Sequence, residues 1–298
     1  MEEKNGLFST EQAKKFIDSV FEDKEPVIPT FYIKYGPPAS GKKGIMDRVI
    51  EKDNINQKTL ITVDVDAIVH SNAKYKEERK EIGNVKKDRR DLYYKYRQEA
   101  DFISDLILNK AILDKYNIAW ETTGNTIAWT VREIKRIKKK GFNVTLVYPL
   151  VSVSSLIKRS EMREQGPDGQ EGAAPDEIST IAYNSINNIN KIINYIDTLY
   201  IYDNSQSSPV LPKLLIEVYN VWDNTKDTFT KPGLRRTIKC NCSIINDIDN
   251  MGFQAKLLEA IYNFLIETKD AKVVKLTDEC ECNIELQQKS RRKTYHRL

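Results

Sequence analysis

The amino-acid sequence predicts an α/β fold, in which a doubly wound and mainly parallel β-sheet carries helices on both faces. Short segments rich in aromatic and β-branched residues alternate along the chain with longer segments of helical periodicity. With 298 residues, 40% of them hydrophobic, the chain is large enough to bury a core between such layers.

The first predicted elements alternate between helix and strand. Ser9 and Gln12 form a capping-box pattern ahead of an opening helix, and residues 30–35 are aromatic and β-branched, as in a buried strand. Residues 45–50 place apolar side chains on one face of a helix, and residues 59–64 are typical of the next strand. This succession of strand, loop, helix and strand is how a doubly wound domain begins.

A charged segment, residues 72–117, follows with an apolar stripe at helical spacing and predicts a long helical insert. Residues 118–121 predict the third strand. The next helix ends at Gly141 behind three lysines, which suit the negative end of a helix dipole, and residues 143–148 predict the fourth strand.

A loop dense in Gly and Pro, residues 166–175, separates the last predicted helices. One helix covers residues 156–163, and Asp176 is expected to cap a second helix that runs to about Tyr195. Two further strands are predicted at residues 199–203 and 214–219.

Two regions are predicted from these elements: an α/β domain over residues 1–222 and a small C-terminal α+β extension over residues 223–298. Within the extension we expect a linker at 231–233, a helix at 253–266 and a strand at 273–276.

The loop after the first predicted strand matches the first seven positions of the phosphate-binding pattern GxxxxGKS/T, and it lies between a strand and a helix as that pattern requires. In such a loop backbone N–H groups point at a triphosphate, and Lys42 reaches the β and γ phosphates. We therefore predict a P-loop NTPase domain that binds ATP or GTP. The predicted nucleotide-binding residues are Gly36, Pro37, Pro38, Ala39, Ser40, Gly41, Lys42 and Lys43.

Lys43 departs from this pattern, which has Ser or Thr at the eighth position to hold Mg²⁺. Asp64, Asp66 or Glu121 can hold the metal instead, directly or through water, and Ser40 supplies a nearby hydroxyl. The alternatives are a phosphate-binding loop that has lost catalysis and a Gly-rich turn that arose by chance.

Asp64 and Asp66 follow the second predicted strand, at the carboxyl edge where open α/β sheets bind ligands. Phosphoryl transfer needs one carboxylate to help position Mg²⁺, which we assign to Asp64, and one to accept the proton of the acceptor hydroxyl, which we assign to Asp66. A helix N-cap at Asp66 is the alternative.

Polar residues also follow the third predicted strand, at the same edge of the sheet. Glu121, Thr123 and Asn125 surround a flexible glycine, and with Asp64 they are the predicted substrate-binding residues.

Arg159 and Arg163 lie one helical turn apart and lead into the Gly-rich loop. On a mobile lid they can neutralise charge on a transferring phosphoryl group, which would make both catalytic together with Lys42 and Asp66. The alternative is a pair of arginines on a solvated helix face.

The order and spacing of these segments resemble the zeta toxin family of P-loop kinases over residues 28–220. The resembling segments are GPPASGK at 36–42, VDVDAIV at 63–69, ETTGN at 121–125, KRSEMRE at 158–164 with APDE at 174–177, and YIYDNS at 200–205.

The resemblance implies a kinase that uses ATP or GTP with Mg²⁺ to phosphorylate a hydroxyl of a small molecule, such as a nucleotide-activated amino sugar. It also implies an antitoxin-like inhibitor as a candidate partner. A second lid arginine of the family falls on Gly172 or Ala173 here, so Arg163 is the candidate replacement. By position, the resemblance implies that Lys42 binds phosphate and that Asp66 is the base. It also implies that Glu121 and Thr123 contact the substrate and that Arg159 is the first lid arginine.

Two other functions remain open. A polynucleotide or RNA-end kinase would use the same fold, with the insert and a basic C-terminal tail holding the strand, although a net charge of +4 makes no case for nucleic acid. The other is a nucleotide-binding regulatory protein without catalysis, in which Lys43 replaces the charge of Mg²⁺.

All four cysteines fall in two Cys-x-Cys pairs in the C-terminal region. Four thiolates can enclose a structural zinc ion, although the usual spacing is wider, and unligated thiols on adjacent strands are the alternative. The candidate zinc ligands are Cys240, Cys242, Cys280 and Cys282.

The mean hydropathy of −0.54 and the lack of a long apolar run argue against a membrane span. The N-terminus has no secretory signal, and sparse cysteines fit a reducing compartment. We therefore expect a soluble cytoplasmic protein.

Overall fold

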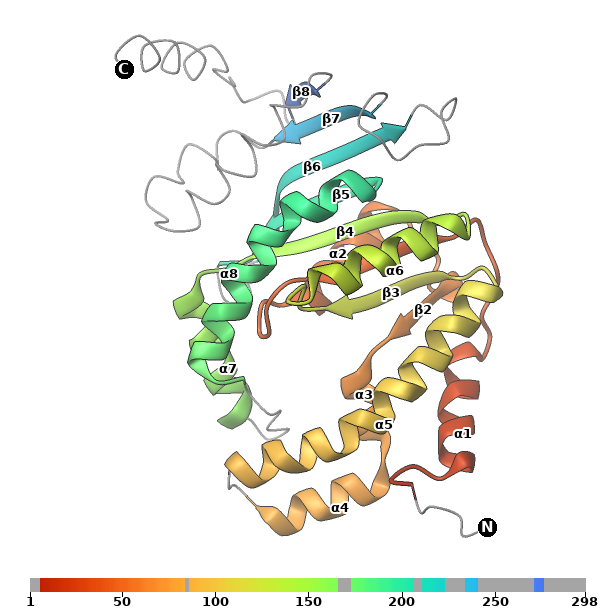
Figure 1. Ribbon diagram of the computed structural model, residues 1–298, viewed down its shortest axis with the longest axis vertical. Coiled ribbons are helices and arrows are strands. Elements are labelled where there is room, and N and C mark those ends of the chain that lie inside the picture. Colours follow the sequence, from red (N-terminus) through yellow and green to blue (C-terminus); the bar gives the residue numbers. More distant parts are fainter. Residues whose placement is uncertain are drawn as a thin grey trace.

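The computed structural model describes residues 6–83, 86–165, 173–205, 211–222, 234–240 and 271–275. They form one eight-stranded β-sheet flanked by helices, with strand order β2-β3-β1-β4-β5-β6-β7-β8 (Figure 1). The strands are β1 (Thr30–Tyr35), β2 (Leu60–Val63), β3 (Asn117–Thr122), β4 (Asn143–Leu150), β5 (Thr198–Asp203), β6 (Lys213–Trp222), β7 (Leu234–Cys240) and β8 (Ala271–Lys275).

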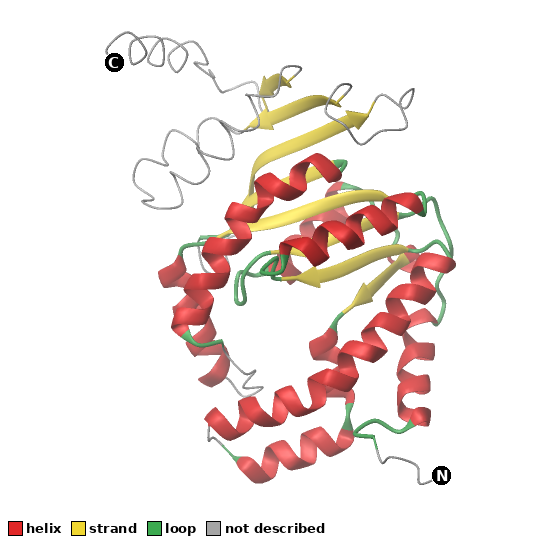
Figure 2. Cartoon of the chain, viewed as in Figure 1, coloured by secondary structure: helices red, strands yellow, loops and turns green. Residues whose placement is uncertain are grey.

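Helices connect the successive strands from β1 to β5 and account for most of the remaining described residues (Figure 2). The α-helices are α1 (Thr10–Phe21), α2 (Lys42–Lys52), α3 (Val65–Ser71), α4 (Ala73–Ile82), α5 (Lys86–Leu113), α6 (Ile127–Lys139), α7 (Val153–Gln165) and α8 (Pro175–Ile192), and two short 3₁₀ turns are η1 (Gln57–Thr59) and η2 (Ile193–Tyr195). None of these described helices is both long and apolar enough to cross a membrane.

The strands β2, β3, β1, β4 and β5 run parallel, and β1 pairs with β3 on one side and β4 on the other. The chain is therefore wound outward from β1 in both directions, which confirms the predicted fold class. Helix α2 covers one face, and α6 and α8 cover the other (Figure 1). Side chains of β1 alternate accordingly: Phe31 and Tyr35 lie in the larger core, whereas Tyr32 packs with Ile45 of α2.

The sheet continues beyond β5 with a change of direction. β6 is antiparallel to β5, β7 is antiparallel to β6, and β8 is parallel to β7. The strands predicted at 214–219 and 273–276 correspond to β6 and β8, and β7 was not predicted. The linker at 231–233 and the helix at 253–266 lie outside the described residues, and the division into regions at residue 222 stays a prediction.

The insert predicted at residues 72–117 consists of two helices, α4 and α5. The apolar stripe in the sequence did not indicate a break between them. The side chain of Asn72 caps α4 by accepting a hydrogen bond from the Tyr75 backbone N–H at 3.0 Å, and α4 ends at Gly83, whose φ is 67°. Helix α5 then packs along α3. Tyr96 of α5 packs against α4, because its ring centroid lies 5.3 Å from that of Tyr75 in α4.

Two predicted helix caps are wrong, whereas the capping box of Ser9 and Gln12 is confirmed. Asp64, not Asp66, is the N-cap of α3, because β2 ends one residue earlier than expected. Asp176 lies in the first turn of α8 behind Pro175, because proline suits the first helical position and moves the N-cap to Ala174.

Candidate active site

The phosphate-binding loop leaves β1 at Gly36 and enters α2 at Lys42. Ala39 and Gly41 have left-handed backbone angles, with φ of 58° and 81°. Gly41 is the N-cap of α2 and contributes no side-chain cap, so the first N–H groups of the helix face the loop without a carboxylate or hydroxyl on them. A loop of this shape before a helix N-terminus can bind phosphate.

Lys42 is buried against the loop, with 7% of its surface exposed. Its Nζ donates to the carbonyl oxygens of Gly36 at 3.1 Å and Pro37 at 2.8 Å, and it forms an ion pair with Glu121 at 3.1 Å. In this conformation the loop's own carbonyl groups occupy positions around the ammonium that phosphate oxygens would take.

Glu121 lies between two lysines at the end of β3. Lys34, a buried residue of β1, forms an ion pair with it at 3.2 Å, and the register of the sheet aligns Lys34 with Glu121. Partial burial raises the pKa of the Glu121 carboxyl, but the charges of Lys42 and Lys34 outweigh this and lower the pKa below its ordinary value. The carboxylate is therefore held ionised beside the phosphate-binding loop.

The residues available for Mg²⁺ differ from those of the usual loop. Lys43 is exposed in the first turn of α2, and the hydroxyl of Ser40 donates to the Pro37 carbonyl at 2.7 Å. The described residues hold no group of three or more acidic, His or Cys side chains that could bind a metal. Because Mg²⁺ commonly binds one or two carboxylates together with phosphate oxygens and water, Glu121 beside Lys42 fits such a site.

Asp64 and Asp66 have different surroundings at the start of α3. Asp64 Oδ1 accepts a hydrogen bond from the Ala67 backbone N–H at 3.1 Å, as the helix cap. Asp66 is exposed, and its Oδ1 accepts a hydrogen bond from the phenol of Tyr93 in α5. Arg97 Nη1 in turn donates to that phenol oxygen at 2.9 Å. The insert therefore contacts the carboxylate predicted to act as the base.

The segment after Glu121 is fixed against α8. The carbonyl of Gly124 accepts hydrogen bonds from Asn188 Nδ2 at 3.0 Å and from the Tyr35 hydroxyl at 3.4 Å. Asn125 Oδ1 accepts one from Asn184 Nδ2 at 2.9 Å. The predicted substrate residues Thr123 and Asn125 thus sit on a segment anchored from two sides.

Arg159 of α7 reaches the edge of the phosphate-binding loop through Asn204. Its Nη2 donates to the Asn204 carbonyl at 2.7 Å, while Asn204 Nδ2 donates to the Ser40 carbonyl at 2.8 Å. Burial lowers the pKa of Arg159, and Asp203 partly offsets this. Arg163 is exposed in the last turn of α7.

The structure brings Lys42 and Glu121 into contact at the loop and joins Arg159 to the loop through Asn204. Asp66 follows β2, which lies on the far side of β3 from β1. Four residues of the site were not predicted from the sequence. Only Lys34 carries a signal there, because it is a lysine inside an otherwise apolar strand. The missed residues are Lys34, Tyr93, Arg97 and Asn204.

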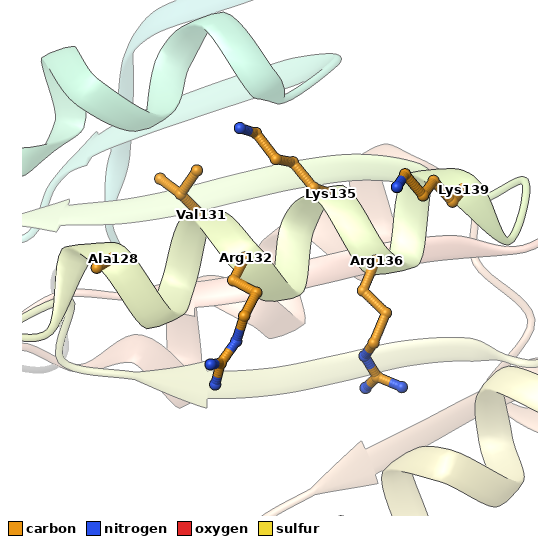
Figure 3. Close-up of a pocket in the computed structure, with 6 residues that line it drawn as sticks. All are labelled: Ala128, Val131, Arg132, Lys135, Arg136 and Lys139. Atoms are coloured by element: carbon orange, nitrogen blue, oxygen red, sulfur yellow. The ribbon is translucent and has the colours of Figure 1, made fainter.

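A shallow pocket elsewhere lies on the outer face of α6, lined by Ala128, Val131 and four basic side chains (Figure 3). Arg136 donates to Glu133 at 2.7 Å, and Lys135 stacks over the ring of Tyr195 at 4.7 Å. Three of these basic groups, Arg132, Lys135 and Arg136, have partners within the fold, and none of the four is hydrogen-bonded to the phosphate-binding loop in the described residues. The four basic lining residues are Arg132, Lys135, Arg136 and Lys139.

The predicted zinc site falls almost entirely outside the described residues. Cys240 is the last residue of β7, whereas Cys242, Cys280 and Cys282 are not described. The zinc site stays a prediction.

Comparison with known proteins gives a family and a fold. The sequence model of the zeta toxin family matches residues 17–208. A structure from the PezAT chromosomal toxin-antitoxin system of Streptococcus pneumoniae is similar to the chain at 16% identity, covers 88% of this chain and 97% of its own, and has a TM-score of 0.53. At that identity the likeness supports the fold alone.

The AvrRxo1-ORF1:-ORF2 complex, solved with ATP, is also similar, at 13% identity over 69% of this chain and 65% of its own, with a TM-score of 0.49. No curated protein sequence matches the chain.

Proposed function

The chain belongs to the zeta toxin family and has the P-loop kinase-like fold of that family, and from this premise we propose that it transfers the γ-phosphoryl group of ATP or GTP to a hydroxyl of a small molecule. The observation that carries the proposal is the buried Lys42, held by two loop carbonyls and Glu121 at the N-terminus of α2. A lysine in this position can contact the β and γ phosphates of a nucleotide bound in the loop.

Nucleotide binding would exchange the partners of Lys42. Lys42 Nζ would leave the carbonyl groups of Gly36 and Pro37 and bind phosphate oxygens, and the N–H groups at the start of α2 would add to the positive field. Glu121 keeps the second ion pair with Lys34, so its carboxylate stays charged when Lys42 turns to the nucleotide. Glu121 would then be the protein's ligand to Mg²⁺, which when bound neutralises phosphate charge.

Transfer requires a proton acceptor and a group that stabilises the transferring charge. The acceptor oxygen bonds to the γ phosphorus while the bond to the β,γ-bridging oxygen breaks, and the nucleoside diphosphate leaves with the electron pair. We assign the hydroxyl proton to Asp66, whose exposed carboxylate lies at the same edge of the sheet as the loop. Arg159 would stabilise the phosphoryl charge and Arg163 would assist it from the same helix.

The acceptor class follows from the family resemblance. We propose a nucleotide sugar bound along Glu121, Thr123 and Asn125, on the segment that Asn188 and Asn184 anchor to α8. An antitoxin-like protein inhibitor is proposed on the same basis, since the structural relative from Streptococcus pneumoniae comes from a toxin-antitoxin system.

A second function has two observations in its favour. Lys43 is exposed where a hydroxyl would hold Mg²⁺, and Ser40 is engaged within the loop. Both fit a regulatory protein that binds a nucleotide without transferring phosphate.

Label transfer from γ-labelled ATP and GTP with Mg²⁺ tests the proposal. The acceptors are nucleotide sugars, nucleosides and 5′-hydroxyl oligonucleotides, and Lys42→Ala is compared with Lys139→Ala, an exposed lysine of α6. We expect transfer to a nucleotide sugar that Lys42→Ala abolishes and Lys139→Ala retains. Transfer to the oligonucleotide alone would replace the acceptor class, and nucleotide binding without any transfer would favour the regulatory protein.

A further inference from the structure

We propose that Tyr93, a residue of the helical insert, is a positioning residue for Asp66: its phenol holds Oδ1 of the carboxylate so that Oδ2 faces the acceptor hydroxyl. The inference rests on the proposed function, and it gives the insert a role in the chemical step besides any role in acceptor binding.

The contact joins two elements that are far apart in the sequence. Asp66 lies in the first turn of α3 and Tyr93 lies on α5, which packs along α3. The Tyr93 hydroxyl donates to Asp66 Oδ1, and Arg97, one turn further along α5, donates through Nη1 to the phenol oxygen at 2.9 Å. The three side chains therefore form one chain of hydrogen bonds that ends on the carboxylate.

Tyr93 is built to act as a donor. Its side chain is buried, with 9% of its surface exposed, whereas Asp66 is exposed. Burial raises the pKa of the phenol, the negative charge of Asp66 raises the pKa further, and Arg97 offsets only part of this. The phenol therefore keeps its proton, and Arg97 strengthens the donated bond by polarising the oxygen.

The consequence concerns the second oxygen of the carboxylate. Within the described part of the chain, the hydrogen bond from Tyr93 engages Oδ1 of the Asp66 carboxylate and leaves Oδ2 outside that contact. An aspartate in the first turn of a helix can otherwise rotate about its side-chain bonds, and a misdirected base loses much of the benefit of proton transfer. A hydrogen bond that fixes Oδ1 from α5 would restrict this rotation and so orient Oδ2 toward the acceptor hydroxyl.

A purely structural role for Tyr93 predicts something different. The hydrogen bond would then only tie α5 to α3, and its loss would lower stability and affect nucleotide binding and turnover alike. A positioning role predicts a loss confined to the chemical step and dependent on the presence of Asp66.

Tyr93→Phe tests this with a matched control, because it removes one oxygen and keeps the buried ring. The control is Tyr94→Phe, the neighbouring residue on α5, whose ring is exposed and stacks beneath Arg90. For each variant we would measure kcat, the KM for nucleotide and acceptor, and thermal unfolding. We expect Tyr93→Phe to lower kcat by about tenfold or more with little change in the KM for nucleotide, since a positioned base contributes about 10²–10⁴-fold.

The decisive comparison repeats Tyr93→Phe in an Asp66→Asn background. There the substitution should produce no further loss of kcat, because the group that Tyr93 positions is gone. Equal kcat in Tyr93→Phe and Tyr94→Phe, or an undiminished loss in the Asp66→Asn background, would overturn the positioning role while leaving the kinase intact. A parent protein that transfers no phosphate would overturn both.

Discussion

Replacing Gly124 by alanine tests how the segment after β3, proposed to bind the substrate, is held against β1 and α8. Gly124 has a φ of 71°, and a Cβ there would lie 2.0 Å from Cζ of Tyr35. The Tyr35 ring is fully buried, and its hydroxyl donates to the Ser185 carbonyl at 2.9 Å and to the Gly124 carbonyl at 3.4 Å. Alanine therefore has to adopt a left-handed backbone and displace a buried ring at once.

The expected magnitude follows from these contacts. A left-handed backbone costs alanine about 1 kcal/mol, and forcing extra atoms into a packed core costs about 1–3 kcal/mol. Loss of the Tyr35 hydrogen bonds adds about 1 kcal/mol. We expect the free energy of unfolding to fall by about 3–5 kcal/mol, the sum of these contributions.

Gly141→Ala is the matched control, because its φ is 82° but the nearest neighbouring atom to a Cβ, Nζ of Lys115, is 4.0 Å away. Its free energy of unfolding should fall by about 1 kcal/mol, because only the cost of a left-handed backbone applies there. Urea unfolding of the parent and both variants measures the difference. Equal losses in the two variants would refute the contact between Gly124 and Tyr35 as the anchor of this segment.

Two further predictions concern the metal and a buried ion pair. Lys43→Ser restores a hydroxyl at the start of α2, so the Mg²⁺ concentration for half-maximal phosphoryl transfer should fall several-fold in a Mg²⁺ titration. Glu217, which is 2% exposed, accepts from Lys52 at 2.5 Å, and although burial raises its pKa, Lys52 and Tyr219 lower the pKa below the ordinary 4.5. A lowered pKa means that its contribution is present at neutral pH and lost as the pH falls below 4.5, so Glu217→Gln should lower the free energy of unfolding by about 1–2 kcal/mol at neutral pH and by less in acid.

One result would contradict each of these two predictions. An unchanged Mg²⁺ requirement in Lys43→Ser would mean that a hydroxyl at this position does not reach the metal. A loss in Glu217→Gln that is the same at neutral pH and in acid would mean that its charge does not contribute to stability.

The phosphate-binding loop and the parallel half of the sheet could be predicted because their signals are local. Gly36 to Lys42 carry the loop within a single short segment, and each strand from β1 to β5 has its own run of apolar residues. The antiparallel direction of β6 could not be predicted, because its continuous apolar run at residues 214–216 is typical of a buried parallel strand.

The side-chain contacts of the site depend on pairings that the sequence does not encode locally. Lys34 and Glu121 meet only because β1 and β3 are neighbours in register. Tyr93 belongs to the predicted helical insert, whose apolar stripe does not show which element it packs on, and its contact with Asp66 depends on how α5 lies on α3. Asp64 rather than Asp66 caps α3 because β2 ends one residue earlier than expected, so the alternative of a helix cap falls on Asp64 and leaves the carboxylate of Asp66 exposed.

The measurement that tests the kinase most directly is paired nucleotide binding and phosphoryl transfer in Lys42→Ala and Asp66→Asn, with Asp18→Asn of α1 as the control for the aspartate change. Calorimetry gives the affinity for the nucleotide, and label transfer to the best acceptor gives the rate. We predict that Lys42→Ala loses both, that Asp66→Asn keeps nucleotide affinity and transfers phosphate about 10²–10⁴-fold more slowly, and that Asp18→Asn resembles the parent. Full transfer by Asp66→Asn, or unchanged nucleotide affinity in Lys42→Ala, would contradict the assignment of this site.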